Sequence, residues 1–155
     1  MNRMTTARRK RTVALIITLA NTEREIRRCF PVMAQLRPHL GEDEFVAQIQ
    51  RQIKTADYSL VFLEEKSRVR CVAGFRITEC LHSGRYCYVD DLITDTSSRS
   101  AGHGGLLLDW IVEHARKSGC NALTLDSGVQ RFRAHRFYLT KRMDIVAYHF
   151  SMKLR

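Results

Sequence analysis

A glycine-rich segment with one arginine, Arg99-Ser-Ala-Gly-His-Gly-Gly105, is the part of the sequence best suited to bind an anion. It lies between an apolar run typical of a strand and one typical of a helix, so its amide groups would face a ligand at a helix N-terminus. Gly102, Gly104 and Gly105 permit close approach of the main chain and positive φ, and Arg99 adds positive charge. These features predict a site for a nucleotide diphosphate, with a simple helix-capping turn as the alternative.

Two common phosphate-binding motifs do not fit this segment. No Lys-Ser or Lys-Thr pair follows the glycines as in a Walker A loop, and Leu107 stands where a dinucleotide fingerprint has its third glycine. The spacing Arg-x-x-Gly-x-Gly instead resembles the acyl-CoA loop of the GNAT superfamily of N-acetyltransferases.

The resemblance implies which residues bind acetyl-CoA. It assigns the diphosphate to Arg99, Ser100, Ala101, Gly102, His103, Gly104 and Gly105, with Ser100 and His103 acting chiefly through their backbone. It assigns the pantetheine arm and the thioester oxygen to main-chain groups around Leu92, Ile93 and Thr94. We expect the His103 side chain to be exposed to solvent rather than catalytic.

A second segment, Ala134-His-Arg-Phe-Tyr138, resembles the GNAT helix in which an alanine packs on the cofactor and a tyrosine faces its sulfur. The resemblance makes Ala134 a cofactor contact and Tyr138 both a cofactor contact and the general acid. A phenol suits this role because its reference pKa of about 10 keeps it protonated at neutral pH. The alternative is a tyrosine that only packs beside Phe137. The sequence departs from the family pattern at Arg131, often asparagine, and at Arg142-Met143, often Gly-Phe. Arg131 either replaces the asparagine's contact with a cofactor phosphate or is a solvated charge, and we favour the solvated charge.

Asp90 and Asp91 are the candidates for a general base. Because they are adjacent on a predicted strand, their side chains should point to opposite faces and cannot form a paired-carboxylate site. Simple alternation places Asp90 on the face of Tyr88 and Leu92, and a β-bulge would reverse that assignment. One of the two is expected to face the acceptor amine, directly or through water; the alternative is a strand-end aspartate satisfied by backbone donors.

The elements that position these motifs follow from hydrophobic periodicity and turn signals. We predict strands at 13–20, 58–64, 69–80, 86–94, 122–126 and 145–154, and helices at 22–40 (bent or restarted at Pro31), 42–56, 105–117 and 129–142. This order predicts an α/β (mixed α+β) fold whose central mixed, mostly antiparallel sheet is flanked by helices. It also resembles the GNAT chain order over roughly residues 12–155.

Length, charge and cysteine content limit the class of protein. The 155 residues suit a single domain at 12–155, preceded by a basic arm at 1–11 that carries five of the cations behind the net charge of +10. Five cysteines without a Cys-x-x-Cys pair indicate reduced, structural thiols, and we expect no metal. The apolar run at 13–20 is too short to span a membrane, and we interpret it as a strand of a cytoplasmic protein rather than a secretory signal.

Together these patterns predict an N-acetyltransferase that passes an acetyl group from acetyl-CoA to a primary amine by direct attack in a ternary complex. A non-catalytic CoA-sensing or nucleic-acid-binding regulatory module is the alternative, although no nucleic-acid readout motif is present. No membrane partner is expected, and a homodimer is compatible with the sequence. The sequence leaves the acceptor open among a protein lysine, a protein N-terminus, a polyamine and a small metabolite amine.

Overall fold

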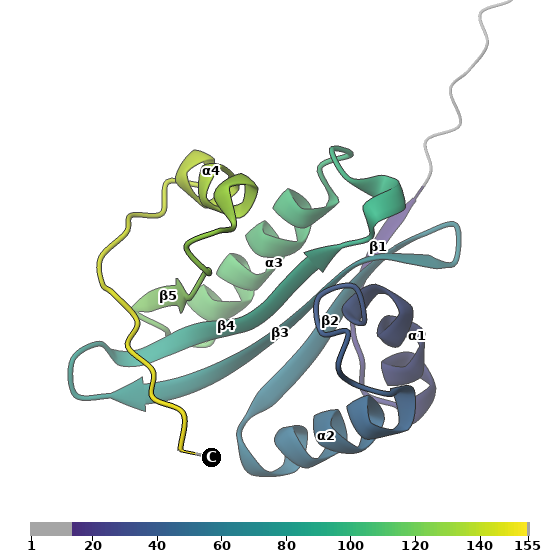
Figure 1. Ribbon diagram of the computed structural model, residues 1–155, viewed down its shortest axis with the longest axis horizontal. Helices are drawn as coiled ribbons and strands as arrows, with labels where there is room; N and C mark the ends of the chain where they lie inside the picture. Colours follow the sequence, from purple (N-terminus) through teal and green to yellow (C-terminus); the bar gives the residue numbers. More distant parts are fainter. Residues whose placement is uncertain (1–13, 155) are drawn as a thin grey trace, which may run out of the picture.

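The computed structural model describes residues 14–154, which contain one five-stranded sheet with the order β1-β2-β3-β4-β5 (Figure 1). The basic arm predicted at 1–11 lies outside the described residues. The elements are β1 (Leu15–Leu19), α1 (Glu23–Met33), α2 (Glu42–Thr55), β2 (Tyr58–Glu65), β3 (Arg68–Cys80), β4 (Gly84–Thr94), the 3-10 turn η1 (Thr96–Ser98), α3 (His103–Lys117), β5 (Ala122–Leu125) and α4 (Phe132–Thr140). Neighbouring strands are antiparallel except β4 and β5, which are parallel. The predicted mixed, mostly antiparallel sheet with flanking helices is confirmed.

Helices cover both faces of the sheet, which therefore has two cores (Figure 1). On one face, α1 and α2 pack against Leu60 and Phe62 of β2. On the other, α3 packs against Val61 and Leu63 of the same strand. A strand buried on both faces is expected to be apolar throughout rather than alternating, which is the pattern of β2. The helix α4 lies near the N-terminal half of α3 and contributes no buried residue.

Local signals in the sequence account for several element boundaries. Thr22 and Glu25 form the predicted capping box at the start of α1. The helix does not restart at Pro31: α1 runs through this proline and ends at Met33, short of the predicted Leu40. Lys66 and Ser67 both have positive φ (51° and 62°), as the tight turn between β2 and β3 requires.

A β-bulge in β4 decides the direction of two acidic side chains. Gly74 of β3 pairs with Asp91 and Phe75 pairs with Val89, so Asp90 is an extra residue in β4. Val89 and Leu92 both pack into the core beneath α3, although alternation alone would separate them. Asp90 and Asp91 therefore both point to the opposite face. The prediction that they point to opposite faces is wrong, because one inserted residue reverses the alternation.

The edge of β4 that faces β5 is only partly paired. Residues Ala122–Leu125 of β5 pair with Tyr86–Val89, and within residues 14–154 no strand continues this pairing along Asp90–Thr94. Half of the main-chain groups in that stretch therefore point away from β3 without a strand partner. The opening begins at the bulge.

The predicted strand at 145–154 is wrong. This segment alternates apolar and polar residues, yet its large apolar side chains are exposed, from 78% for Ile145 to 90% for Phe150. Within the described residues none of its backbone groups bonds to another backbone group, and the segment meets the fold through the 2.9 Å pair between His149 Nδ1 and Asp126 Oδ2. Alternation describes how side chains would sit in a sheet, but a strand also needs an aligned neighbour for its backbone groups. The predicted helix at 129–142 is likewise shorter, Phe132–Thr140.

None of the helices found between residues 14 and 154 has both the length and the apolar character needed to cross a membrane.

Candidate functional site

The segment Arg99–Gly105, called the glycine loop below, joins η1 to the N-terminus of α3. Asp95 holds η1, the turn that precedes the glycine loop. The Asp95 carboxylate accepts hydrogen bonds from the amide and the hydroxyl of Ser97 at 3.2 and 2.7 Å. These bonds lower the pKa of Asp95. Gln35, just beyond α1, donates to Asp95 at 3.1 Å and accepts from Thr96 N at 3.0 Å. The loop thus begins from a fixed point at the end of β4.

The first turn of α3 presents backbone donors without a side-chain cap. Gly102 precedes the helix with φ of 82°, and the helix has no acidic residue in its first turn. The amides of His103, Gly104 and Gly105 stand where an α-helix has no internal acceptors, and the first carbonyl to be used is that of Gly102, bonded to Leu106 N at 3.1 Å. This arrangement can bind an anion.

Gly104 and Gly105 serve close packing. A Cβ on Gly104 would lie 3.0 Å from Thr94 Oγ1, and one on Gly105 would lie 3.3 Å from Lys141 Nζ. Lys141 also donates to Gly105 O at 3.2 Å and to Asp109 at 2.7 and 2.8 Å. The glycines therefore let β4, the start of α3 and the end of α4 approach one another.

The expectation of an exposed His103 side chain is wrong. It is 5% exposed, because its position at the start of α3 directs it into the fold. Its Nδ1 has no hydrogen-bond partner among the described residues. His103 can therefore contribute to the glycine loop through its backbone amide rather than its ring.

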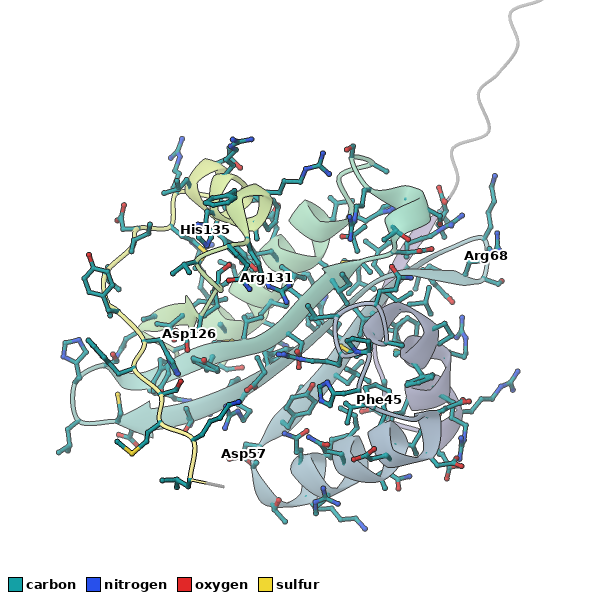
Figure 2. The ribbon with its side chains drawn as sticks, in the orientation of Figure 1. Phe45, Asp57, Arg68, Asp126, Arg131 and His135 are labelled. Carbon is teal, nitrogen blue, oxygen red and sulfur yellow. The ribbon has the colours of Figure 1, made fainter. Side chains whose placement is uncertain are left out.

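Tyr138 and Ala134 lie on α4, both partly buried. The ring of Tyr138 makes an edge-on contact with Phe137, with ring centroids 5.2 Å apart. Burial raises the pKa of the Tyr138 phenol, which keeps it protonated at neutral pH. Arg131, just before α4, is exposed as expected, yet its charge opposes the rise in the pKa of both Tyr138 and Asp91. Figure 2 shows Arg131 between α4 and β4. Its charge therefore acts on both the α4 tyrosine and Asp91 of β4.

On the opposite face of the sheet, a cleft of about 430 Å³ collects acidic and phenolic side chains; we call it the carboxylate cleft. Its polar floor is formed by Asp90 and Asp91 of the bulge together with Tyr58, Tyr88 and Asp126. Its other wall comes from the α1–α2 region, namely Met33, Arg37, His39, Leu40, Phe45, Gln48, Ile49 and Gln52. In Figure 2, strands of the sheet lie between Phe45 of α2 and Asp126 beside β5. A cleft of this volume suits a small molecule or the end of a flexible chain.

The two adjacent carboxylates have different partners. Arg76 binds Asp90 through both oxygens, at 2.9 Å from Nε to Oδ2 and 2.6 Å from Nη2 to Oδ1. Arg37 binds Asp91 through Oδ1 alone, at 2.8 Å from Nε and 2.7 Å from Nη2. Burial raises the pKa of the Asp91 carboxyl above its ordinary value, and Arg37 opposes that rise.

Comparison with known proteins connects this geometry to a family. The model of the Acetyltransferase (GNAT) family matches residues 19–143. This chain belongs to the GNAT acetyltransferase family. It is 34% identical over 112 residues to a Bacillus subtilis (strain 168) protein named uncharacterized N-acetyltransferase YhdJ, a match that covers 72% of this chain and 79% of the relative.

Solved structures share the GNAT fold. The aminoglycoside N-acetyltransferase AAC(6′)-Iy, solved in complex with CoA, superposes with a TM-score of 0.83 at 13% identity, covering 94% of this chain and 97% of that one. A GNAT family acetyltransferase from Staphylococcus aureus superposes with a TM-score of 0.77 at 17% identity, covering 90% and 98%. The chain is thus an N-acetyltransferase of the GNAT family, whose members use acetyl-CoA.

The GNAT fold brings most of the residues predicted from sequence to one region. The glycine loop, Thr94 and α4 meet on the α3 side of the sheet, at the open edge of β4. Asp90 and Asp91 lie on the opposite face. Two groups of the carboxylate cleft were not predicted, Tyr58 and Asp126, and neither was the pairing of Arg37 with Asp91. Arg37 is 54 residues from Asp91, and no local pattern could have connected them.

Proposed function

We propose that this GNAT enzyme transfers an acetyl group from acetyl-CoA to a primary amine by direct attack in a ternary complex. One observation carries the proposal: the opening between β4 and β5 starts at the bulge that turns Asp90 and Asp91 into the carboxylate cleft. A donor bound along the open edge and an acceptor bound in the cleft would therefore meet at a single point of β4. Such a meeting point is what direct transfer between two bound substrates needs.

The donor side fits acetyl-CoA through main-chain groups. The free amides at the start of α3, with Arg99 beside them, would hold the diphosphate. Ser100, Ala101, Gly102, His103, Gly104 and Gly105 complete that loop, and the unpaired edge at Leu92, Ile93 and Thr94 would hold the pantetheine arm and the thioester oxygen. Ala134 would pack on the cofactor. When bound, acetyl-CoA supplies an acetyl thioester that an amine can attack.

Tyr138 is proposed as the general acid. Its partly buried phenol is held protonated, since burial raises its pKa, and it can donate its proton to the departing thiolate. Arg131 faces the same region and would stabilise the phenolate that is left. The second amine proton returns the phenol to its starting form.

Asp90 and Asp91 are proposed to bind the incoming ammonium and to supply the general base. An amine attacks only when its nitrogen carries a free electron pair, so one proton must leave the ammonium first. Both carboxylates line the cleft beside the open edge of β4. Residues 12–155 would then act as one catalytic domain, with no metal required.

Two linked measurements test this function. Thermal unfolding with acetyl-CoA at about 100 times its dissociation constant should add roughly 2.7 kcal/mol to the stability of the folded protein. Release of CoA thiol should then depend on an added primary amine from a panel of alkylamines, polyamines and peptides. No stabilisation at millimolar acetyl-CoA, or thiol release that no amine accelerates, would contradict the proposal.

A further inference from the structure

The carboxylate cleft contains two aspartates that differ in their remaining hydrogen-bonding capacity. Both oxygens of Asp90 are bound by Arg76. Both bonds from Arg37 go to the same oxygen of Asp91, so Asp91 Oδ2 has no hydrogen-bond partner within residues 14–154. Because the Asp91 side chain is only 16% exposed, this acceptor is held in place rather than dispersed into solvent. Among the described residues, Asp91 thus keeps one carboxylate oxygen available to accept a hydrogen bond, whereas both oxygens of Asp90 are already bound.

Two tyrosines of the cleft also differ in whether the hydroxyl already has a hydrogen-bond partner. Tyr88 donates its hydroxyl to Asp126 Oδ2 at 2.6 Å. Tyr58 is 4% exposed, and its hydroxyl has no hydrogen-bond partner in the described part of the chain. The hydroxyl oxygen of Tyr58 keeps some accessible surface, and Tyr58 lines the cleft, so the hydroxyl can be reached from there. Burial and the charges of Asp91 and Asp90 raise the pKa of Tyr58, so the phenol stays neutral.

A glycine places the free hydroxyl beside the free carboxylate oxygen. A Cβ on Gly74 would lie 1.7 Å from Tyr58 Oη, so the hydroxyl occupies the space of the missing side chain. Gly74 is the cross-strand partner of Asp91, and paired residues on one face have their Cβ positions about 5 Å apart. Tyr58 Oη therefore lies next to the Asp91 side chain, and both face the cleft.

We infer that Asp91 Oδ2 and Tyr58 Oη together form the subsite that binds the acceptor as a primary alkylammonium ion, with Arg37 as the positioning residue. This inference rests on the proposed acetyl transfer and selects Asp91 over Asp90. The ammonium donates one N–H to each oxygen. Its proton then passes to Asp91 Oδ2: an N–H bond breaks, an O–H bond forms, and the nitrogen keeps the electron pair used in the attack. Arg37 holds Oδ1 and so directs Oδ2 into the cleft.

Direct binding of n-butylamine, measured by calorimetry on the full chain, tests the subsite, with n-butanol as the uncharged control. Tyr58→Phe should weaken n-butylamine binding about tenfold, and Asp91→Asn about 10- to 100-fold, as expected for a neutral and a charged hydrogen bond. Tyr148→Phe removes the same hydroxyl from a tyrosine that is 87% exposed and outside the cleft, and should change binding less than about threefold. The preference for n-butylamine over n-butanol should fall in the first two variants, which a purely structural role would not produce. Acetyl-CoA binding, followed in parallel, should stay unchanged in all three.

Several outcomes would overturn the subsite. The first is a Tyr58→Phe variant that binds n-butylamine with wild-type affinity. The second is an Asp90→Asn variant whose affinity for n-butylamine falls as much as that of Asp91→Asn. The third is a wild-type protein that binds n-butylamine no better than n-butanol. In the last case, amine-dependent thiol release with another acceptor would leave the proposed function standing. A wild-type protein that neither binds acetyl-CoA nor transfers its acetyl group would instead contradict the proposed function, whatever n-butylamine does.

Discussion

The two faces of the sheet build the two halves of the site by different means. On the α3 side, the glycine loop and the open edge of β4 offer mainly backbone groups, contributed by two consecutive stretches of chain. On the α1–α2 side, the carboxylate cleft consists of side chains from the end of α1, the α1–α2 connection, α2, β2 and β4, with Asp126 after β5. The first half suits a ligand common to a whole family, because main-chain donors change little with sequence. The second half can differ between relatives by single substitutions, and this is where acceptor choice would lie.

Tyr138 gives the sharpest test of this division, since it is the side chain on the α3 side proposed to take part in the chemistry. Tyr138→Phe should lower kcat by roughly 10²- to 10⁴-fold, the range for loss of a general acid, with the Kd for acetyl-CoA unchanged. Stopped-flow turnover and a CoA titration measure the two effects. Tyr148→Phe removes the same atom from a tyrosine that is 87% exposed and should behave as wild type. Full activity in Tyr138→Phe would remove the acid role.

Gly74→Ala tests how tightly the acceptor side is packed. The new methyl group needs space held by the Tyr58 hydroxyl, 1.7 Å away, so either the buried ring or β3 must move. We expect a loss of about 1–3 kcal/mol in the free energy of unfolding, measured with urea, and weaker n-butylamine binding. Gly41→Ala is the control, because nothing lies within 4 Å of its added Cβ. A Gly74→Ala protein as stable as Gly41→Ala would contradict the packing described for Tyr58.

Arg99→Ala tests the donor side. If Arg99 adds charge to a site built mainly from amides, its loss should weaken acetyl-CoA binding by about tenfold without abolishing it. The thermal shift produced by acetyl-CoA should shrink accordingly. Arg51→Ala, an exposed charge on α2, keeps the change in net charge the same and should leave the shift intact. Equal affinity in both variants would refute the diphosphate assignment.

The smallest expected effect is a contrast in pH dependence between Asp95 and Asp91. Hydrogen bonds from Ser97 and Gln35 lower the pKa of Asp95, so its contribution to stability is present above the unfolded pKa of about 4 and is lost at lower pH. Asp95→Ala should cost about 1 kcal/mol at pH 7 and less as the pH falls. Arg70 is the charged group that faces Asp95.

Asp91 should show the opposite trend. Burial raises its pKa despite Arg37 and Arg131, so ionising it reduces stability as the pH rises above about 4, with Asp90 and Tyr58 also facing it. Relative to wild type, Asp91→Asn should therefore gain stability between about pH 3 and pH 7. Urea unfolding across that range measures both variants. Parallel pH profiles for the two substitutions would show that the two carboxylates do not differ in this way.

Local patterns in the sequence predicted the first nine α and β elements in their correct order, and the resemblance to GNAT enzymes implied which segments would form the donor site. The glycine loop could be found because its function depends on consecutive residues. The strand predicted at 145–154 failed because alternation does not guarantee a pairing partner, and His103 was misjudged because only packing against the rest of the fold buries it.

What the sequence determined by itself, then, is what neighbouring residues decide through backbone geometry, such as the glycine-rich start of α3 and the tight turn between β2 and β3. The tertiary structure alone decided the acceptor side. One unpaired residue in the ladder between β3 and β4 turned Asp90 and Asp91 to the same face, and Arg37, Tyr58 and Gly74 reached Asp91 from separate elements. A bulge is set by the pairing of two strands, and so are the partners it brings together. No single stretch of the chain contains that information.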